Sequence, residues 1–307
     1  MEKFVVSYSP FARSSNDINK MFGYVALILL MPMVFGLVFF GLNSLFVVLT
    51  SVIVCFLSEA FYNLLASGKF KVNDISFLVT GLILALTMPV NMPLYIVGVS
   101  AFFSIFVVKM IFGGLGKNSF NPALLGRLAA GMMASSIASN LYEITMNGEV
   151  YTSLASGGEN LIFNLFTGKA VGGIGTTCIA VIIIAYAFLV YMSVIDWKIP
   201  LISALAYFIT AYSLCGMEKA LLNICSGSFL FVAVFMMTDP NTSPDAFLSK
   251  VVYSLLFGIV SAVFWNMGKL GENTVFVAAI MVNVLVPFMD KYLMIRQKPL
   301  GGYRYAH

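Results

Sequence analysis

Long apolar runs separated by short polar segments dominate the chain. A transmembrane helix needs about 20 mostly apolar residues to cross a hydrocarbon core of about 30 Å. The runs predict ten such helices, near residues 21–41, 44–66, 75–90, 94–112, 119–137, 174–194, 199–214, 221–237, 247–265 and 273–290. Several are short and bounded by glycine or proline, which is typical of broken helices around a buried site and also of ordinary helices that are tilted or end earlier. The pattern predicts an all-α integral membrane protein.

Composition excludes a soluble enzyme. Of the 307 residues, 60% are hydrophobic and 10% are charged, so too few polar side chains are present to cover a surface that faces water. The four cysteines stand isolated in apolar segments and the single histidine is His307. These residues offer no zinc site, no cysteine-ligated cluster and no pair of imidazoles for haem, so we expect no metal site.

Basic residues predict the orientation in the membrane. With a cytoplasmic N-terminus, thirteen of the 17 Lys and Arg residues fall inside, whereas Lys169, Lys219 and Lys269 fall outside and Arg127 lies within a span. This bias indicates a multi-pass protein of the cell (inner) membrane with both termini in the cytoplasm. Residues 1–20 then form a cytoplasmic segment, 138–173 an extracytoplasmic loop and 291–307 a cytoplasmic tail. The net charge of +4 reports this topology and does not indicate nucleic-acid binding.

Two motifs recur along the chain. The sequence GGLGKNSF at 113–120 is echoed by GKLGENTVF at 268–276, and TMPVNMP at 87–93 is echoed by TDPNTSP at 238–244. Glycine and proline at loop positions can also match by chance. Read as a repeat, each copy holds five spans, so the second copy enters the membrane from the opposite side. The prediction is therefore two inverted five-helix repeats, 21–137 and 174–290, with binding sites between them.

Three ionisable residues lie at or near membrane depth. Glu59 and Arg127 both stand about 10–12 Å from the inner ends of their spans, at about 1.5 Å per residue, so an ion pair between them is possible. Such residues either fix the packing of helices or serve ion passage or cofactor binding. Asp239 precedes a proline, where it either caps a helix or binds a cation.

Two motifs hold candidate ligand-binding residues. Asn121 precedes Pro122 at the predicted start of a helix, where it either caps the helix or faces a ligand. Gly173, Gly175 and Thr176 belong to the glycine-rich segment GGIGTT that precedes a span. Such a turn can hold a phosphate group, although glycines in membranes also allow close helix contacts.

Taken together, FNPALLGR at 120–127, MTDPNTSP at 237–244, GGIGTT at 172–177 and SPF at 9–11 resemble the D subunit of Rnf-type ion-translocating ferredoxin:NAD oxidoreductases. The B subunit of the sodium-translocating NADH:quinone reductase is related. The resemblance covers essentially the whole chain. It implies a membrane subunit that passes electrons between ferredoxin and NAD through flavin, coupled to Na⁺ or H⁺ translocation, and that is not catalytic alone. Its partners are the other membrane and peripheral subunits, including those that carry flavin and iron–sulfur clusters.

The resemblance also implies cofactor sites. FMN is joined through its phosphate to a threonine of an external loop by a flavin transferase, and Thr152 in NGEVYTSLA at 147–155 takes that position, although Asn147 and Ser153 depart from the family pattern. A second, non-covalent flavin, riboflavin, is also implied. The cofactor-binding candidates are Thr152, Arg127, Asn121, Gly173, Gly175, Thr176 and Asp239, and the candidates for an ion path are Glu59 and Asp239.

Two other functions fit the same pattern. Inverted five-helix repeats with broken helices and few charges also form channels for small neutral solutes such as urea. A structural membrane scaffold without flavin is the third possibility, in which Thr152 is an ordinary loop residue.

Overall fold

The computed structural model describes most of the chain. The described residues are 15–72, 74–116, 118, 120–134, 144–146, 149–151, 166, 168, 172–225, 228–268 and 273–294. Thr152 and the motif residues 153–155 lie outside the described residues.

The apolar runs of the first half form one group of helices. These are α1 (Ser15–Phe40), α2 (Leu42–Ser67), α3 (Ser76–Leu86), α4 (Leu94–Phe102), which continues as the π-helix η1 (Phe103–Met110), and α5 (Pro122–Ala134). Within this group α2 packs on α3 and α4, α1 packs on α3, and α4 packs on α5.

The second half forms a group with similar internal packing. Its elements are α8 (Ile179–Tyr191), α9 (Lys198–Cys215), α10 (Met217–Cys225), α11 (Phe229–Phe231), the π-helix η4 (Val232–Met236), α12 (Phe247–Met267) and α13 (Thr274–Met294). Here α9 packs on α10, η4 and α12, α12 packs on α13, and α8 packs on α11. Helices α9 and α12 approach closely at Gly258, where an added Cβ would overlap the carbonyl oxygen of Ser203.

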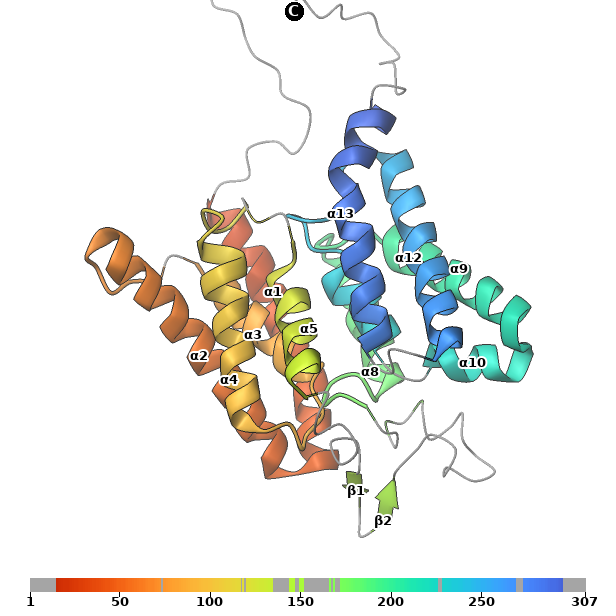
Figure 1. The fold of residues 1–307 in the computed structure, drawn as a ribbon, viewed down its shortest axis with the longest axis horizontal. Coiled ribbons are helices and arrows are strands. Elements are labelled where there is room, and N and C mark those ends of the chain that lie inside the picture. The colour runs from red at the N-terminus through yellow and green to blue at the C-terminus, as the bar shows by residue number, and fades with distance from the viewer. Residues whose placement is uncertain are drawn as a thin grey trace, which may run out of the picture.

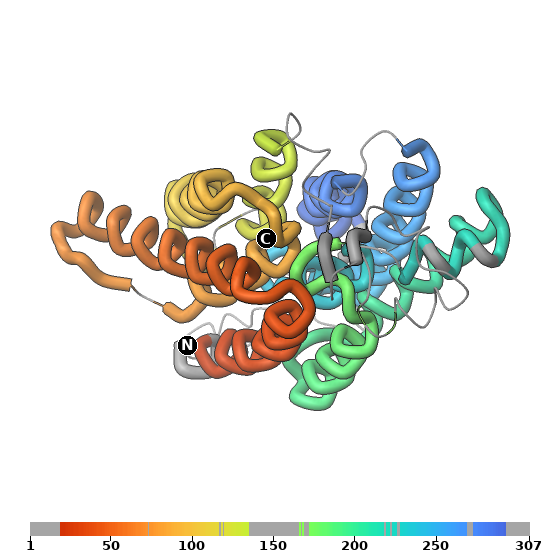
Figure 2. The backbone as a smooth tube through the Cα atoms, turned by 90° about the horizontal axis from the view of Figure 1, so that it is seen from below, coloured from red at the N-terminus to blue at the C-terminus, as the bar shows by residue number. Residues whose placement is uncertain are grey.

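The two groups lie side by side, one coloured red to yellow and the other green to blue (Figures 1 and 2). They touch where α1 packs on α8 and where α5 packs on α13. Between the halves in sequence, β1 (Ile144–Met146) and β2 (Glu149–Tyr151) pair as an antiparallel hairpin with Ile144 opposite Tyr151.

Five described helices are long and apolar enough to cross a membrane. They are Asn19–Phe40, Leu42–Ser67, Lys198–Cys215, Phe247–Met267 and Thr274–Tyr292. Residues 219–225 and 229–236, which meet at a bend of 53°, make a sixth if the pair counts as one span. Large apolar side chains such as Phe46, Ile53 and Ile209 are exposed on these helices. The predicted all-helical, multi-pass membrane protein is confirmed in this coarser form.

The other four predicted spans contain helices shorter than their ranges. Helix α3 has 11 residues, α5 and α8 have 13 each, and the α4–η1 pair covers 17. At about 1.5 Å per residue, 11 to 13 residues extend only about 17–20 Å. The chain stops α3 at Leu86, where the Thr87 hydroxyl donates to the carbonyl of Leu84 at 2.8 Å, and Pro89 follows. Residues 174–177, the start of the predicted span 174–194, belong instead to a turn before α8.

Candidate functional site

A cavity lies where α1, α3, α5, α8 and η4 meet, and we call it the central cavity. Its wall is mostly apolar, with polar side chains brought in from both halves of the chain, namely Ser76, Thr80, Lys109, Asn118 and Asn121 from the first and Thr238, Asp239 and Asn241 from the second. Its free volume is about 60 Å³. An apolar cavity with a few convergent polar groups is the usual form of a small-molecule site.

Asn121 stands in the wall of this cavity and caps α5. Its Oδ1 accepts hydrogen bonds from the backbone N–H groups of Ala123 at 3.0 Å and Leu124 at 3.3 Å. Its Nδ2 donates to the carbonyl of Met236, at the end of η4, at 3.2 Å. The predicted cap is confirmed, and the same side chain joins the two halves of the protein beside the cavity.

Asp239 lies in the cavity wall just after η4. Its Oδ1 accepts from the backbone N–H of Asn241 at 3.2 Å and its Oδ2 accepts from the hydroxyl of Thr242 at 3.5 Å. The carboxylate therefore organises its own turn, and these contacts do not cap a neighbouring helix. Burial raises the pKa of Asp239 to about 6, because its effect exceeds that of the two hydrogen bonds, which lower it.

Asn118 supplies an unused acceptor to the same wall. The side chain is 4% exposed, and its Nδ2 donates to the carbonyl of Phe120 at 2.9 Å. Its Oδ1 has no hydrogen-bond partner in the part of the chain that the structure describes. A buried unpaired acceptor is costly, so this atom is suited to a ligand that brings an N–H or O–H donor.

The central cavity adjoins a wider hollow of about 680 Å³, which we call the vestibule. The two share part of their walls, including Phe22, Leu115 and Thr238. Together they fall in the range of about 300–1,000 Å³ that is usual for small-molecule sites. In the vestibule wall, Lys250 and Asp196 form an ion pair at 2.9 Å. Burial raises the pKa of Asp196, but hydrogen bonds from Lys250 and from the backbone N–H of Lys198 outweigh it, so the pKa lies below its usual value.

Arg127 is fully buried outside the central cavity. Its Nε donates to the carbonyl of Thr87 at 3.0 Å, one terminal nitrogen donates to Oδ1 of Asn273 at 3.0 Å, and its guanidinium lies 4.7 Å from the ring centre of Phe276. The pair with Glu59 that the sequence allowed is not among these contacts, which direct Arg127 toward the end of α3 and the start of α13. Arg127 thus ties the two halves together.

The glycine-rich segment closes the end of α3. The backbone N–H of Ile174 donates to the carbonyl of Met88 at 2.9 Å, and that of Gly175 donates to the carbonyl of Leu86 at 2.7 Å. The N–H of Gly173 donates to Oγ1 of Thr176 at 3.0 Å. A Cβ at Gly173 would lie 2.8 Å from the backbone of Thr87, so the glycine permits this close approach. These N–H groups are used within the protein, which favours the close-contact interpretation over a phosphate site.

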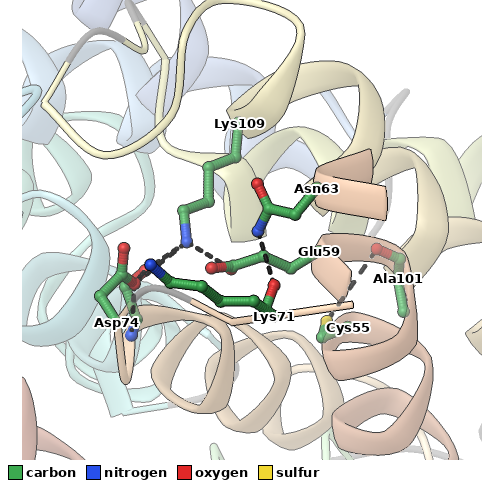
Figure 3. Close-up of polar contacts among 8 residues, drawn as sticks. Cys55, Glu59, Asn63, Lys71, Asp74, Ala101 and Lys109 are labelled. Carbon is green, nitrogen blue, oxygen red and sulfur yellow. Dashed lines mark hydrogen bonds and ion pairs between the residues drawn. The ribbon is translucent and has the colours of Figure 1, made fainter. Parts of the chain in front are cut away.

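Glu59 takes part in a buried ion cluster that sequence reasoning did not predict. Its Oε2 lies 2.7 Å from Nζ of Lys109, which also contacts Oδ1 of Asp74 at 3.2 Å and Oγ of Ser76 at 2.5 Å (Figure 3). The side chains of Lys109 and Glu59 are 3% and 1% exposed. We call the adjoining hollow of about 330 Å³ the acidic cup; Glu59, Asn63, Asp74 and Lys109 are among its lining residues.

Lys109 was missed because it was counted among the cytoplasmic basic residues. It follows a long apolar run and precedes Gly113 and Gly114, as a lysine at the end of a span often does. The structure places it in the last turn of the π-helix η1, a helix type that is frequent at functional sites. The sequence did hold a signal for this cluster. Lys109 continues an apolar helical run, and two carboxylates, Glu59 and Asp74, stand on neighbouring segments.

The structure therefore sorts the predicted residues into three places. Asn121 and Asp239 share the central cavity, Arg127 and the segment 173–176 meet around Thr87, and Glu59 stands in the acidic cup. Among the described residues, no group of three or more His, Cys, Asp and Glu side chains could hold a metal ion, and all four cysteines are free thiols.

Comparison with known proteins identifies the family of the chain. The model of the NQR2, RnfD, RnfE family matches residues 5–300. The chain is 30% identical to the D subunit of the Na⁺-translocating ferredoxin:NAD⁺ oxidoreductase complex of Acetobacterium woodii, over 94% of this chain and 92% of the relative. It is 26% identical to the D subunit of the proton-translocating complex of Clostridium ljungdahlii, over 94% of both chains.

Another relative has a longer chain. The B subunit of the Na⁺-translocating NADH-quinone reductase of Pseudoalteromonas atlantica is 27% identical over 78% of this chain and 65% of its own length. The family resemblance expected from the motifs is thus confirmed over nearly the whole sequence: the chain belongs to the NQR2, RnfD, RnfE family.

Proposed function

We propose that the protein is a membrane subunit of an ion-translocating electron transport complex. In this complex it passes electrons between ferredoxin and NAD through flavin while Na⁺ or H⁺ crosses the membrane. The observation that carries the proposal is the match over 94% of the chain to relatives named as the D subunit of such complexes. The protein acts with other membrane and peripheral subunits, including those that carry flavin and iron–sulfur clusters, and is not catalytic alone.

The central cavity and vestibule fit a non-covalent flavin. A flavin ring has an apolar end and a polar edge that carries an N–H donor and carbonyl acceptors. The unpartnered Oδ1 of Asn118 matches the donor, and Asp239, when protonated, can donate to a carbonyl. When bound, the flavin supplies the electron transfer that amino-acid side chains lack. Asn121 joins the two halves of the wall through its hydrogen bond to the carbonyl of Met236.

The charge of the walls favours riboflavin over FMN in this site. Among the described residues that line the two hollows, the basic side chains are Lys109 and Lys250. Both are paired with carboxylates, Lys109 with Glu59 and Asp74 and Lys250 with Asp196. Neither is left to bind a phosphate group, whereas the neutral ribityl chain of riboflavin needs no such partner.

FMN joined to Thr152 is the second flavin of the proposal. The support is the position of Thr152 in the family motif and the charge bias that places residues 138–173 outside. A flavin transferase is the implied partner for the attachment. This flavin would exchange electrons with a neighbouring protein of the complex at the outer face.

The acidic cup is the proposed start of the ion path. Glu59 and Asp74 offer carboxylate oxygens, and Asn63 offers an amide, which are suitable ligands for a hard monovalent cation or for a proton. Asp239 stands farther along the chain at the central cavity and is the second candidate on the path. The two relatives in bacterial Rnf-type complexes are named for different ions, one for Na⁺ and one for protons, so both ions are compatible with this family.

We further propose ten spans in two inverted five-helix repeats, with both termini in the cytoplasm of a cell (inner) membrane protein. In support, the same pairs of elements pack in each half: the first on the third, the second on the third and fourth, and the fourth on the fifth. The halves also touch through equivalent members, α1 with α8 and α5 with α13, as a two-fold relation requires. The short helices then complete their crossings together with the adjoining loops inside the protein.

Flavin analysis of the purified complex tests the function. Acid precipitation should release riboflavin, and the band of this chain should fluoresce in a denaturing gel unless Thr152→Val is present. Asn118→Leu should lower the released flavin, whereas Asn266→Leu, on an exposed residue of α12, should not. Absence of both flavins from the wild-type chain would refute the proposal, and flux of a neutral solute through liposomes would then favour a channel.

Labelling with a thiol reagent that does not cross membranes tests the orientation. Glu159→Cys should react in intact cells and Lys298→Cys should react only after the membrane is opened. The reverse pattern would overturn the proposed topology.

A further inference from the structure

Lys109 and Ser76 stand in the wall that separates the acidic cup from the central cavity. Lys109 lines both hollows, and Ser76 lines the central cavity. The three N–H donors of the Lys109 ammonium are matched by three acceptors, on Glu59, Asp74 and Ser76. Ser76 in turn donates its hydroxyl to Asp74. One hydrogen-bonded unit therefore touches both sites.

The buried members of this unit carry unequal charge. Glu59 and Asp74 bring two carboxylates against the single ammonium of Lys109, and Asp74 is the most exposed of the three, at 14%. Exposed Lys71 directs its ammonium toward Asp74 at the side of the cup (Figure 3). Because an unbalanced buried charge is costly, a further positive charge at the cup is favourable, and Lys71 or a bound monovalent cation can supply it.

We propose that Lys109 is a positioning residue that links the charge of the flavin in the central cavity to the cation affinity of the acidic cup. This inference rests on the proposed function. One electron supplied by a partner protein of the complex adds one negative charge beside Lys109. Lys109 is then drawn toward the cavity, Glu59 and Asp74 lose part of their positive partner, and one monovalent cation from the aqueous side enters the cup. One electron is thus balanced by one cation, and loss of the electron returns Lys109 to the carboxylates and expels the cation.

Linkage makes this coupling measurable from either site. If reduction tightens cation binding tenfold, saturating cation must raise the midpoint potential of the flavin by the same free energy, which is 59 mV for one electron. Lys109 is the one basic side chain among the described residues that lines both hollows, so it is the residue whose loss should remove the coupling.

The test uses the purified whole complex. Retention of radioactive Na⁺ is measured after oxidation and after reduction, and the potential of the non-covalent flavin is titrated with and without Na⁺ and across pH. In the wild type we expect about tenfold tighter Na⁺ binding on reduction. For a proton-coupled complex, we expect the midpoint potential to fall by up to about 59 mV for each unit of pH increase. Lys109→Met should bind the cation with equal affinity in both redox states, whereas Lys291→Met, which removes an exposed lysine of α13, should keep the wild-type ratio.

Two further variants keep the test decisive if Lys109→Met does not fold. Lys109→Arg retains the charge and should retain most of the coupling. Ser76→Ala, which removes the hydrogen bonds of the Ser76 hydroxyl to Lys109 and Asp74, should reduce the ratio by several fold. A wild-type ratio in Ser76→Ala and Lys109→Met would overturn the role of Lys109 and leave the flavin site standing. A wild-type complex without non-covalent flavin would overturn the flavin site and this inference together.

Discussion

Removal of the Arg127 guanidinium should weaken the contact between the two halves of the protein. Each hydrogen bond from this charged group, to the Thr87 carbonyl and to Oδ1 of Asn273, contributes about 1.5–3 kcal/mol, and the contact with Phe276 adds about 0.5–2 kcal/mol. Loss of the buried charge also removes its desolvation cost, which is several kcal/mol. The net cost of Arg127→Met is therefore expected to be only about 1–4 kcal/mol.

A double-mutant cycle isolates the contact itself. Combining Arg127→Met with Asn273→Ala cancels the desolvation of Arg127 and should leave a coupling of about 1.5–3 kcal/mol. Neutral hydrogen bonds between helices in membranes average only about 0.6 kcal/mol, so a value above 1 kcal/mol identifies the charged bond.

The assay is reversible unfolding of the purified protein in mixed detergent and SDS micelles, followed by intrinsic fluorescence. Pairing Arg127→Met with Asn266→Ala, on an exposed residue of α12, serves as the control and should be additive within about 0.5 kcal/mol. A coupling between residues 127 and 273 at or below about 0.6 kcal/mol would refute the view that Arg127 ties the halves through Asn273.

Three further predictions concern the cavity, the glycine-rich segment and the vestibule. Because burial raises the pKa of Asp239 to about 6 from 3.8, this carboxyl should contribute on the order of 2–3 kcal/mol of stability below pH 4, and that contribution should be lost as the pH rises through 6. Asp239→Asn should remove this pH-dependent contribution in thermal melts. Gly173→Ala should lower stability by about 1–3 kcal/mol through overlap with Thr87. The control Gly23→Ala, where nothing lies within 4 Å, should be neutral or slightly stabilising. Equal melting temperatures for the two variants would contradict the close packing at Gly173. Asp196→Asn should lower the free energy of unfolding by about 0.5–1 kcal/mol near pH 7. Because the pKa of Asp196 is lowered, the difference from wild type should shrink as the pH falls below 4. An undiminished difference at pH 3 would count against the pair with Lys250.

Hydropathy predicted the long helices well and the short ones poorly. The ranges 21–41, 44–66 and 247–265 agree closely with α1, α2 and α12, because those runs are uniformly apolar over a full crossing. The range 75–90 overran α3 because Met88 and Val90 are apolar although they lie in a loop beside Pro89. Hydropathy measures burial, and a loop buried in protein has the same signal as a helix in lipid.

The sequence identified individual residues of the site but not which of them lie together. Asn121 and Asp239 were recognised from their proline motifs, because capping and turn chemistry is local in sequence. The sequence allowed Arg127 as a partner of Glu59 but could not select it, since depth along a span leaves the rotation of a helix undetermined. Lys109 stands 50 positions from Glu59, and only the packing of η1 against α2 brings them together.

The closure of α3 has a consequence for biogenesis. The carbonyls of Leu86 and Met88 receive their donors from Gly175 and Ile174, which the ribosome delivers only after the entire first half has been made. Until then, the carbonyls of Leu86 and Met88 in the nascent first half lack these two donors. Two separately expressed halves should assemble into a working protein, while either half alone should be degraded.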